Sequence, residues 1–223
     1  NKKGTILENV IVKDGVPDFD DSSLTENGRA SYPTSHIPNA DKLGYVNRHP
    51  KNIIMLTCDA FGVLPAVSKL SAEEAVGQFL LGYTAKVAGT EGGVLEPQAT
   101  FSPCFGLPFM PLPPIEYAKL LKNMITEHDV DCWLVNTGWT SGAYGTGQRM
   151  KLEITRKIIS GILSGEMAKC DTIFHEKTGM TIPLCSKVSS EYFIPEMSWN
   201  NKQAYLDTLT ILNKLKNDYL TQS

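Results

Sequence analysis

Two short, continuous apolar runs constrain the fold more than any other feature of this sequence. They are residues 53–57 (IIMLT) and 132–136 (CWLVN). A strand with one face in water alternates apolar and polar side chains, so a strand that is apolar throughout must be buried on both faces. Segments with helical periodicity lie between and after these runs. The pattern predicts the α/β class, with a sheet covered by helices.

Four segments have the apolar spacing of amphipathic helices. The clearest begins at Ser71, because Ser71 and Glu74 have the spacing of a capping box, in which each side chain bonds the backbone N–H of the other residue. Apolar residues continue at helical spacing as far as Val87, so we expect this helix to extend to Ala88. The other helices are expected over residues 115–126, 152–163 and 204–220.

The remaining segments are rich in turn-forming residues. Residues 6–12 predict a strand that runs into a turn at residues 14–15 (DG), and residues 17–43 are expected to be mostly loop. Residues 89–114 are rich in glycine and proline, which is typical of a functional or mobile segment. We expect residues 89–106 to move as a lid on glycine hinges, and the alternative is a permanently packed loop.

Composition excludes several classes of function. The chain has 223 residues, enough for one large domain or two small ones, and its net charge is −3. A binder of nucleic acid or of an anionic membrane is usually basic, so neither is expected as a partner. No apolar run is long enough to span a bilayer. The sequence starts without the apolar segment of a signal peptide and ends without a peroxisomal signal, so we expect a cytoplasmic location.

The five cysteines are spread along the chain without the paired spacing of a disulfide framework or a zinc site. The four histidines also stand apart from one another. We therefore expect every cysteine to be a free thiol in a reducing compartment, and we expect no metal site.

A glycine-rich segment, residues 142–147, has the G-x-x-x-x-G spacing of a P-loop. A P-loop continues with Lys and with Ser or Thr, which hold the phosphates and Mg²⁺, but Gln148 and Arg149 occupy these positions. One interpretation is a loop that lines a nucleotide without cradling its triphosphate. The other is a glycine-rich turn that precedes a helix.

Arg29 lies in a polar segment without periodicity. Its guanidinium could fork onto phosphate or carboxylate oxygens, or it could be an ordinary solvated side chain. Asp20 and Asp21 are interpreted as a solvated acidic turn. Trp133 and Trp139 are expected to pack in the core rather than to stack on a ligand.

Several stretches taken together resemble one enzyme family, and they extend in order over almost the whole chain. They include residues 18–21 (DFDD), 25–33 (TENGRASYP), 56–65 (LTCDAFGVLP), 82–91 (GYTAKVAGTE), 134–139 (LVNTGW) and 145–149 (GTGQR). The chain is similar to the carboxy-terminal part of the ATP-dependent phosphoenolpyruvate carboxykinases. This resemblance implies that residues 1–223 form the carboxy-terminal portion of a mononucleotide-binding domain, with a mixed sheet and flanking helices.

The resemblance also implies roles for four residues. Arg29 corresponds to the family arginine that binds ATP phosphate and substrate oxygens, and it is the expected catalytic residue. The family's adenine-side motif implies that Arg149, Met150 and Thr155 bind the nucleotide. Gln148 replaces the usual lysine and Met150 the usual isoleucine. Residues 89–93 read GTEGG where many relatives have GTERG, so a lid arginine is absent.

The implied reaction converts oxaloacetate and ATP to phosphoenolpyruvate, CO₂ and ADP, as in gluconeogenesis. The family's P-loop, its ligands for Mg²⁺ and Mn²⁺ and its carboxylate-binding arginine lie upstream of the matched region and have no counterpart here. The chain also starts without Met. We therefore expect an inactive carboxy-terminal fragment whose partner is the N-terminal part of the same enzyme. The alternative is a non-catalytic nucleotide-binding or scaffolding subunit derived from that family.

Overall fold

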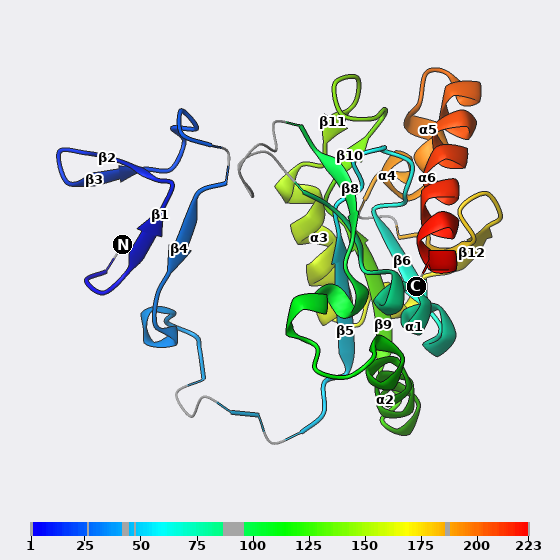
Figure 1. The fold of residues 1–223 in the computed structure, drawn as a ribbon, viewed down its shortest axis with the longest axis horizontal. Coiled ribbons are helices and arrows are strands. Elements are labelled where there is room, and N and C mark those ends of the chain that lie inside the picture. The colour runs from blue at the N-terminus through cyan, green and yellow to red at the C-terminus, as the bar shows by residue number, and fades with distance from the viewer. Residues whose placement is uncertain are drawn as a thin grey trace. The chain divides into compact units, whose positions relative to one another are not determined.

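A five-stranded mixed sheet organises the larger of two units in this computed structural model (Figure 1). The structure describes residues 2–25, 27–41, 45–46, 48–86, 96–185 and 188–222. The larger unit contains residues 50–85 and 99–223, and the smaller unit contains residues 1–49 and 86–98. The sheet of the larger unit has the strand order β12–β13–β6–β9–β5. Its strands are β5 (Asn52–Thr57), β6 (Val67–Leu70), β9 (Asp131–Asn136), β12 (Thr172–His175) and β13 (Met180–Pro183).

The two apolar runs form β5 and β9, which are parallel neighbours, whereas the other pairings in this sheet are antiparallel. Successive side chains of β9 enter opposite layers, as the pleat requires. Cys132 and Leu134 pack in a cluster with residues of α1 (Ala72–Leu81), α2 (Pro114–Glu127) and α6 (Lys202–Gln222). Trp133 and Val135 pack in a second cluster with α3 (Leu152–Leu163). The predicted sheet with helices on both faces is therefore confirmed.

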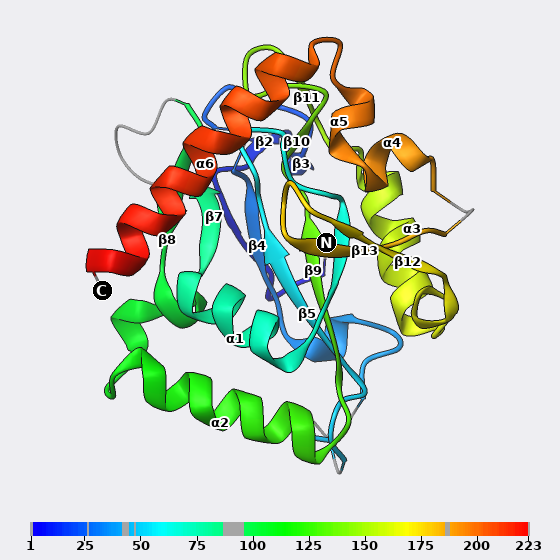
Figure 2. The same cartoon turned by 90° about the vertical axis from the view of Figure 1, so that its right-hand side faces the viewer.

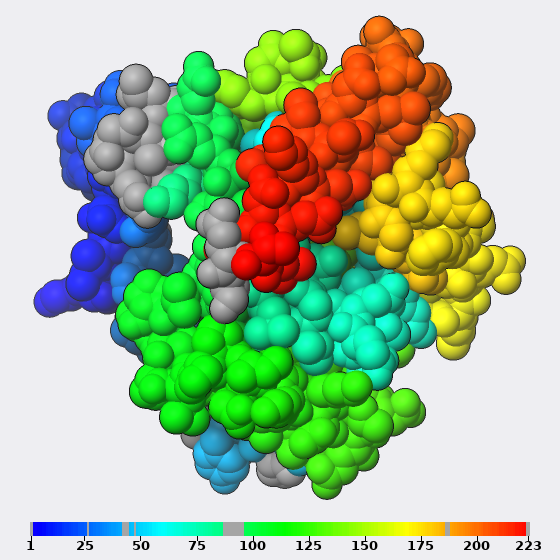
Figure 3. All heavy atoms as spheres, turned by 45° about the vertical axis from the view of Figure 1, so that its right-hand side comes forward, coloured from blue at the N-terminus to red at the C-terminus, as the bar shows by residue number. Residues whose placement is uncertain are grey.

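Helices α1, α2 and α6 cover one face of this sheet, and α3 lies on the other face (Figure 2). The space-filling view shows α6, in red, beside α1, in teal, on the outer surface of the larger unit (Figure 3). The predictions for α2, α3 and α6 are confirmed, with α3 matching residue for residue. No helix among the described residues is long and apolar enough to cross a membrane.

The predicted extent of the helix beginning at Ser71 is wrong. Its capping box is present, but α1 ends at Leu81. Gly82 adopts the left-handed conformation (φ 52°), and a β-carbon there would lie 1.8 Å from the carbonyl oxygen of Ser102. Only glycine fits this helix end. The chain then continues as β7 (Tyr83–Lys86), which pairs with β8 (Gln98–Phe101).

The smaller unit consists of two-stranded sheets. Strand β1 (Ile6–Glu8) pairs with β4 (Arg29–Ser31), and β2 (Ile11–Lys13) pairs with β3 (Val16–Asp18) across the predicted DG turn. The single strand predicted over residues 6–12 is wrong, because Asn9 has a positive φ of 57° and separates β1 from β2. All described residues between 2 and 49 are exposed or half-buried, so this part of the unit has no core of its own.

Residues 89–95, the first part of the proposed lid over residues 89–106, lie outside the described residues. The described remainder of the glycine- and proline-rich segment forms β8 and two short 3₁₀ helices, Pro103–Phe105 and Leu107–Phe109. The mobility of residues 89–106 therefore stays a prediction.

The expectation that every cysteine is a free thiol is wrong for two of the five. Cys170 and Cys185 form a disulfide, whereas Cys58, Cys104 and Cys132 are free and buried. The hairpin β12–β13 brings the pair together, because the ladder continues past its last strand pair to Asp171 and Leu184, next to the two cysteines. The separation of 15 residues resembles no spacing motif, so the pairing depends on this hairpin register.

Candidate functional site

The candidate site lies at the carboxyl ends of the parallel strands β5 and β9. Ligands of α/β proteins bind beyond this edge of a parallel sheet, where the loops after the strands converge. Here the two loops are residues 58–65 and 137–147, which follow β5 and β9 respectively. Asp59, near the start of the first loop, and Asn136, the last residue of β9, are completely or almost completely buried.

Asn136 connects the two loops. Its Oδ1 accepts hydrogen bonds from the backbone N–H of Asp59 at 3.1 Å and of Gly138 at 2.9 Å. Its Nδ2 donates to the carbonyl oxygen of Leu64 at 3.3 Å. One amide side chain thereby fixes both ends of the β5 loop against the start of the β9 loop. Buried polar networks of this kind hold a unique geometry only when each group has a partner.

The Asp59 carboxylate organises the β5 loop from within. Oδ2 accepts from the N–H groups of Val63 at 2.7 Å and Leu64 at 2.9 Å, and Oδ1 accepts from that of Phe61 at 2.9 Å. The Tyr83 hydroxyl also donates to Oδ1, at 2.8 Å. Burial, followed by the neighbouring Asp59 carboxylate, raises the pKa of Tyr83 far above its ordinary value, so this hydroxyl remains a donor.

The loops after β5 and β9 are also joined by close contacts between their main chains. The Trp139 N–H donates to the Asp59 carbonyl oxygen at 2.8 Å, and a β-carbon on Gly138 would lie 2.2 Å from the Asp59 nitrogen. A β-carbon on Gly62 would lie 2.1 Å from the carbonyl oxygen of Gly142. These glycines are required because the two main chains touch with no room for a side chain.

The glycine-rich segment 142–147 joins two short antiparallel strands, β10 (Trp139–Thr140) and β11 (Gln148–Arg149). A P-loop instead leads from a strand directly into a helix, so this segment is a hairpin turn and its P-loop spacing is incidental. The hairpin pairs Trp139 with Arg149, whose guanidinium carbon lies 5.6 Å from the centre of the Trp139 ring. This distance is that of a cation–π contact.

Trp133 and Trp139 are both buried, as expected for core residues. Arg149 is exposed. Burial raises the pKa of the Cys58 thiol, while Arg149 opposes that shift. This part of the site therefore has a planar cation that is supported by an indole and open to solvent.

Met150 and Thr155 follow Arg149 in the same unit. The Met150 N–H donates to the Gly138 carbonyl oxygen at 2.7 Å, and its side chain belongs to the core cluster beneath α3. Only 8% of Met150 is exposed, so little of it can face a ligand. Thr155 is half-buried in the first turn of α3.

Arg29 belongs to the smaller unit, so Arg149, Met150 and Thr155 share one unit and Arg29 another. On β4 it lies opposite Glu8, with Nη1 3.6 Å from the carboxylate, and the side chain is 52% exposed. The Asn27 amide, with its oxygen turned toward Arg29, accepts from Nε at 3.1 Å and Nη2 at 2.8 Å. Arg29 also lines a cavity of about 240 Å³ together with Asp18 and Asp21.

The acidic turn next to Arg29 is paired rather than merely solvated. The Lys13 ammonium contacts Asp18 at 3.1 Å and Asp21 at 2.9 Å. Hydrogen bonds from Ser23 and Lys13 hold the pKa of Asp21 well below its usual value. These carboxylates keep Lys13 engaged, and Arg29 keeps exposed surface on which an anion could bind.

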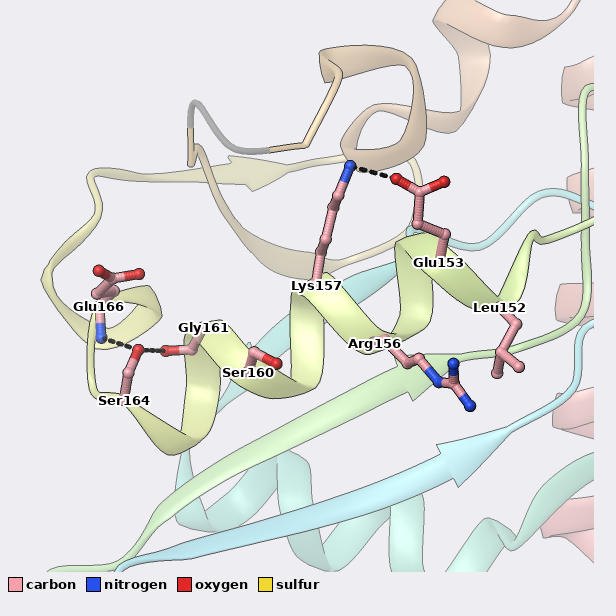
Figure 4. A pocket seen from close by; sticks show the side chains of 8 residues that line it. All are labelled: Leu152, Glu153, Arg156, Lys157, Ser160, Gly161, Ser164 and Glu166. Carbon is pink, nitrogen blue, oxygen red and sulfur yellow. Dashed lines mark hydrogen bonds and ion pairs between the residues drawn. The ribbon is translucent and has the colours of Figure 1, made fainter.

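Other features of the described residues carry less chemistry. No three His, Cys, Asp or Glu side chains cluster as metal ligands within the part of the chain that the structure describes. Among these residues, the divalent metal that the resemblance implies therefore finds no fitting donor set. A shallow groove of about 780 Å³ follows the outer side of α3, where Lys157 pairs with Glu153 at 2.7 Å (Figure 4). Arg149, Met150 and Thr155 do not line it.

Asp59 and Asn136 are the site residues that the sequence analysis did not identify. Both lie within stretches that carry the family resemblance, and each ends or follows a buried apolar run. A polar side chain placed directly after such a run is a signal that could have identified them. Their partners could not be found in this way, because the hydrogen bonds of Asn136 with Asp59 and Leu64 span more than 70 residues of sequence.

Comparison with known proteins matches residues 1–191 to a family model described as phosphoenolpyruvate carboxykinase. The phosphoenolpyruvate carboxykinase (ATP) of Rhizobium etli (strain CIAT 652) is 52% identical over 204 residues, which cover 91% of this chain and 38% of that protein. The protein of the same name from Methylorubrum extorquens (strain PA1) is 51% identical over 212 residues, 94% of this chain and 39% of the relative. The chain thus spans about two fifths of the length of these curated relatives.

Proposed function

The chain belongs to the phosphoenolpyruvate carboxykinase family, and from this premise we propose that it supplies the purine-binding part of an ATP-dependent carboxykinase. The reaction would convert oxaloacetate and ATP to phosphoenolpyruvate, CO₂ and ADP, the direction used in gluconeogenesis. The two relatives reported above carry the enzyme's name and match over nine tenths of the chain, so a non-catalytic scaffolding subunit is not favoured.

The observation that carries this proposal is the Arg149 guanidinium held over Trp139 at the carboxyl edge of β5 and β9. A planar cation fixed by an aromatic ring on one side offers its other side to the face of a purine. We assign this contact to the adenine of ATP. Thr155 would offer a hydroxyl to the base, and the exposed fraction of Met150 would close the pocket edge.

Arg29 would act at the phosphate end of the nucleotide. Its guanidinium can fork onto oxygens of the transferring phosphoryl group and of the substrate. Phosphoryl transfer depends on positioning and on neutralising the charge spread over these oxygens, so a cation there contributes most in the transition state. The divalent metal that the family uses would neutralise the same charge. Its ligands are proposed to lie outside this chain.

Arg149→Ala should weaken ATP binding by the 223-residue chain about tenfold, because an exposed or partly desolvated cation–π contact contributes on the order of 1 kcal/mol or more. Isothermal titration calorimetry with ATP measures this change. Arg156→Ala is the matched control, since Arg156 is an exposed arginine on α3 beyond the hairpin. Equal affinity of the two variants for ATP would remove Arg149 from the purine site.

The partner of this chain is proposed to be the remaining portion of the family polypeptide. Two features support this assignment. The described strands of the smaller unit have no core, and two-stranded sheets are marginally stable by themselves. The larger unit also exposes large apolar side chains that lie close together in the sequence, with exposed fractions of 39–86%. We call them the apolar patch: Phe105, Leu107, Phe109, Leu112 and Ile115. Exposed apolar patches of this kind usually mark a protein interface.

The isolated chain should show no carboxykinase turnover with ATP, Mn²⁺ and oxaloacetate, because it spans about two fifths of its relatives and its described residues form no metal cluster. Adding the complementary portion of the Rhizobium etli relative should restore measurable phosphoenolpyruvate formation. Phe109→Asp should reduce that recovery, because it places a charge in the apolar patch. Turnover by the chain alone would refute this prediction.

A further inference from the structure

We propose that Ser198 and Trp199 are positioning residues that hold the purine-binding hairpin β10–β11 in its binding geometry. The inference rests on the proposed function, because it holds that the fixed conformation of this hairpin serves purine binding by Arg149. Ser198 ends the short helix α5 (Pro195–Ser198), and Trp199 follows it. Both residues lie beyond residue 191, where the match to the family model ends.

Ser198 holds the start of the hairpin turn through its hydroxyl. The hydroxyl donates to the Pro195 carbonyl oxygen at 2.7 Å, so its oxygen is free to accept from other groups. It accepts from the Ser141 N–H at 3.2 Å, and the Thr140 hydroxyl lies 3.4 Å away. The Ser198 hydroxyl therefore contacts Thr140, the last residue of β10, and Ser141, the residue that follows it.

Ser141 is a residue that needs such support. Its φ is +62°, a conformation that residues other than glycine adopt only at an energetic cost. The surrounding structure must fix it, and the Ser198 hydroxyl bonds its N–H directly. Loss of this bond would free Ser141 to relax, and the turn that leads to Arg149 would move with it.

Trp199 holds the facing loop. Its Nε1–H donates to the Gly62 carbonyl oxygen at 2.8 Å, and its ring packs edge-on against Tyr205 of α6 at 5.8 Å. Gly62 is the residue whose main chain meets Gly142 so closely that a β-carbon does not fit. Ser198 therefore holds the loop after β9, and Trp199 holds the loop after β5, on either side of the contact between Gly62 and Gly142. We call these two contacts the brace.

Helix α5 is itself fixed to the sheet. Its Glu196 carboxylate pairs with Lys177 at 2.6 Å and lies 3.4 Å from Nε2 of His175, whose ring is buried at the end of β12. Burial opposes ionisation of Glu196, but Lys177 and then His175 hold its pKa below the usual value. The carboxylate therefore stays charged at neutral pH, and its contacts join α5 to the end of β12 and to Lys177.

The test compares Ser198→Ala with the conservative Ser198→Thr and with the control Ser190→Ala, an exposed serine on the neighbouring helix α4 (Ser190–Phe193). Without nucleotide, amide hydrogen exchange at Ser141 should accelerate at least tenfold in Ser198→Ala and stay unchanged in the control. Affinity for ATP should fall about five- to tenfold in Ser198→Ala, and Ser198→Thr should restore most of both properties.

The outcomes separate this inference from the proposed function. An unchanged rate of amide hydrogen exchange at Ser141 in Ser198→Ala would refute the positioning role of Ser198. A faster rate together with an unaltered affinity for ATP would also refute it. Failure of the unsubstituted chain to bind ATP would refute the proposed function and, with it, the purpose assigned to the brace. Trp199→Phe, which keeps the ring but loses the bond to Gly62, should reproduce the loss of ATP affinity, and unaltered affinity would remove Trp199 from the proposal.

Discussion

The chain with Asp59→Ala should lose on the order of 3–5 kcal/mol of folding free energy, enough to unfold much of the larger unit. Asp59 is fully buried and accepts four hydrogen bonds, from three backbone N–H groups and the Tyr83 hydroxyl. Alanine leaves these donors buried without an acceptor. Each such orphaned group costs on the order of 1–3 kcal/mol, and relaxation of the loop recovers part of the sum.

Urea denaturation followed by circular dichroism measures this loss, with Asp131→Ala as the control. Asp131 is an aspartate at the start of β9 that is 40% exposed and pairs with Lys69 at 3.0 Å, so its loss should cost less than about 1 kcal/mol. Tyr83→Phe removes one of the four donors and should cost about 1 kcal/mol, which keeps the prediction testable if Asp59→Ala does not fold. Equal stability of Asp59→Ala and Asp131→Ala would contradict the role of this carboxylate.

The core of the larger unit follows from hydrophobic patterning alone. The apolar run 132–136 requires two covered faces, and the helix periodicities supply the layers that cover them. The expectation that the run 53–57 is also buried on both faces is wrong, because β5 is the last strand of the sheet order and its Leu56 is 55% exposed. The α3 helix matches its predicted bounds because its apolar face, with Ile158 and Ile162, is strongly periodic and Ser164-Gly165 ends it. Patterns of this kind depend on burial, which sequence periodicity reports directly.

Two of the wrong predictions arise where the backbone conformation of a single residue overrides a local sequence pattern, and a third arises from a contact between distant residues. Apolar spacing continues past Gly82, but the left-handed conformation there ends α1 and starts β7. Asn9 divides a β-branched segment in the same way. The disulfide Cys170–Cys185 depends on the register of a hairpin, which spacing alone does not reveal. Conformations at single residues and contacts between distant ones leave little trace in periodicity.

The candidate site, like the fold, could be predicted only in part from the sequence. The roles of four residues follow from the family resemblance and stay predictions: Arg29, Arg149, Met150 and Thr155. Physical reasoning from the sequence alone would not have linked Arg149 to Trp139, because the pairing of β10 with β11 creates that contact. The residues that brace the loops, Asp59, Asn136 and Ser198, act on backbone groups far along the chain, so no local motif predicts their partners.

Arg29→Ala should lower kcat of the assembled enzyme by about 10²–10³-fold while changing ATP affinity no more than about threefold. Its charge is proposed to meet phosphate oxygens most closely when they carry the charge of the transition state, so its loss raises the barrier more than it weakens ground-state binding. Steady-state kinetics of the chain combined with the complementary family polypeptide measures kcat, and calorimetry measures ATP affinity.

Three further variants separate the fork geometry of Arg29 from its charge, provide a control and test its ion pair. Arg29→Lys keeps the charge but cannot bond two oxygens in parallel, so its kcat should lie between those of the unsubstituted enzyme and Arg29→Ala. Arg48→Ala removes an exposed arginine of the same unit and should leave kcat unchanged. Arg29 pairs with Glu8 across two short strands, so Glu8→Gln tests whether that exposed ion pair matters, and we expect a small effect. An Arg29→Ala enzyme with the kcat of Arg48→Ala would show that Arg29 is a surface residue of β4 and takes no part in phosphoryl transfer.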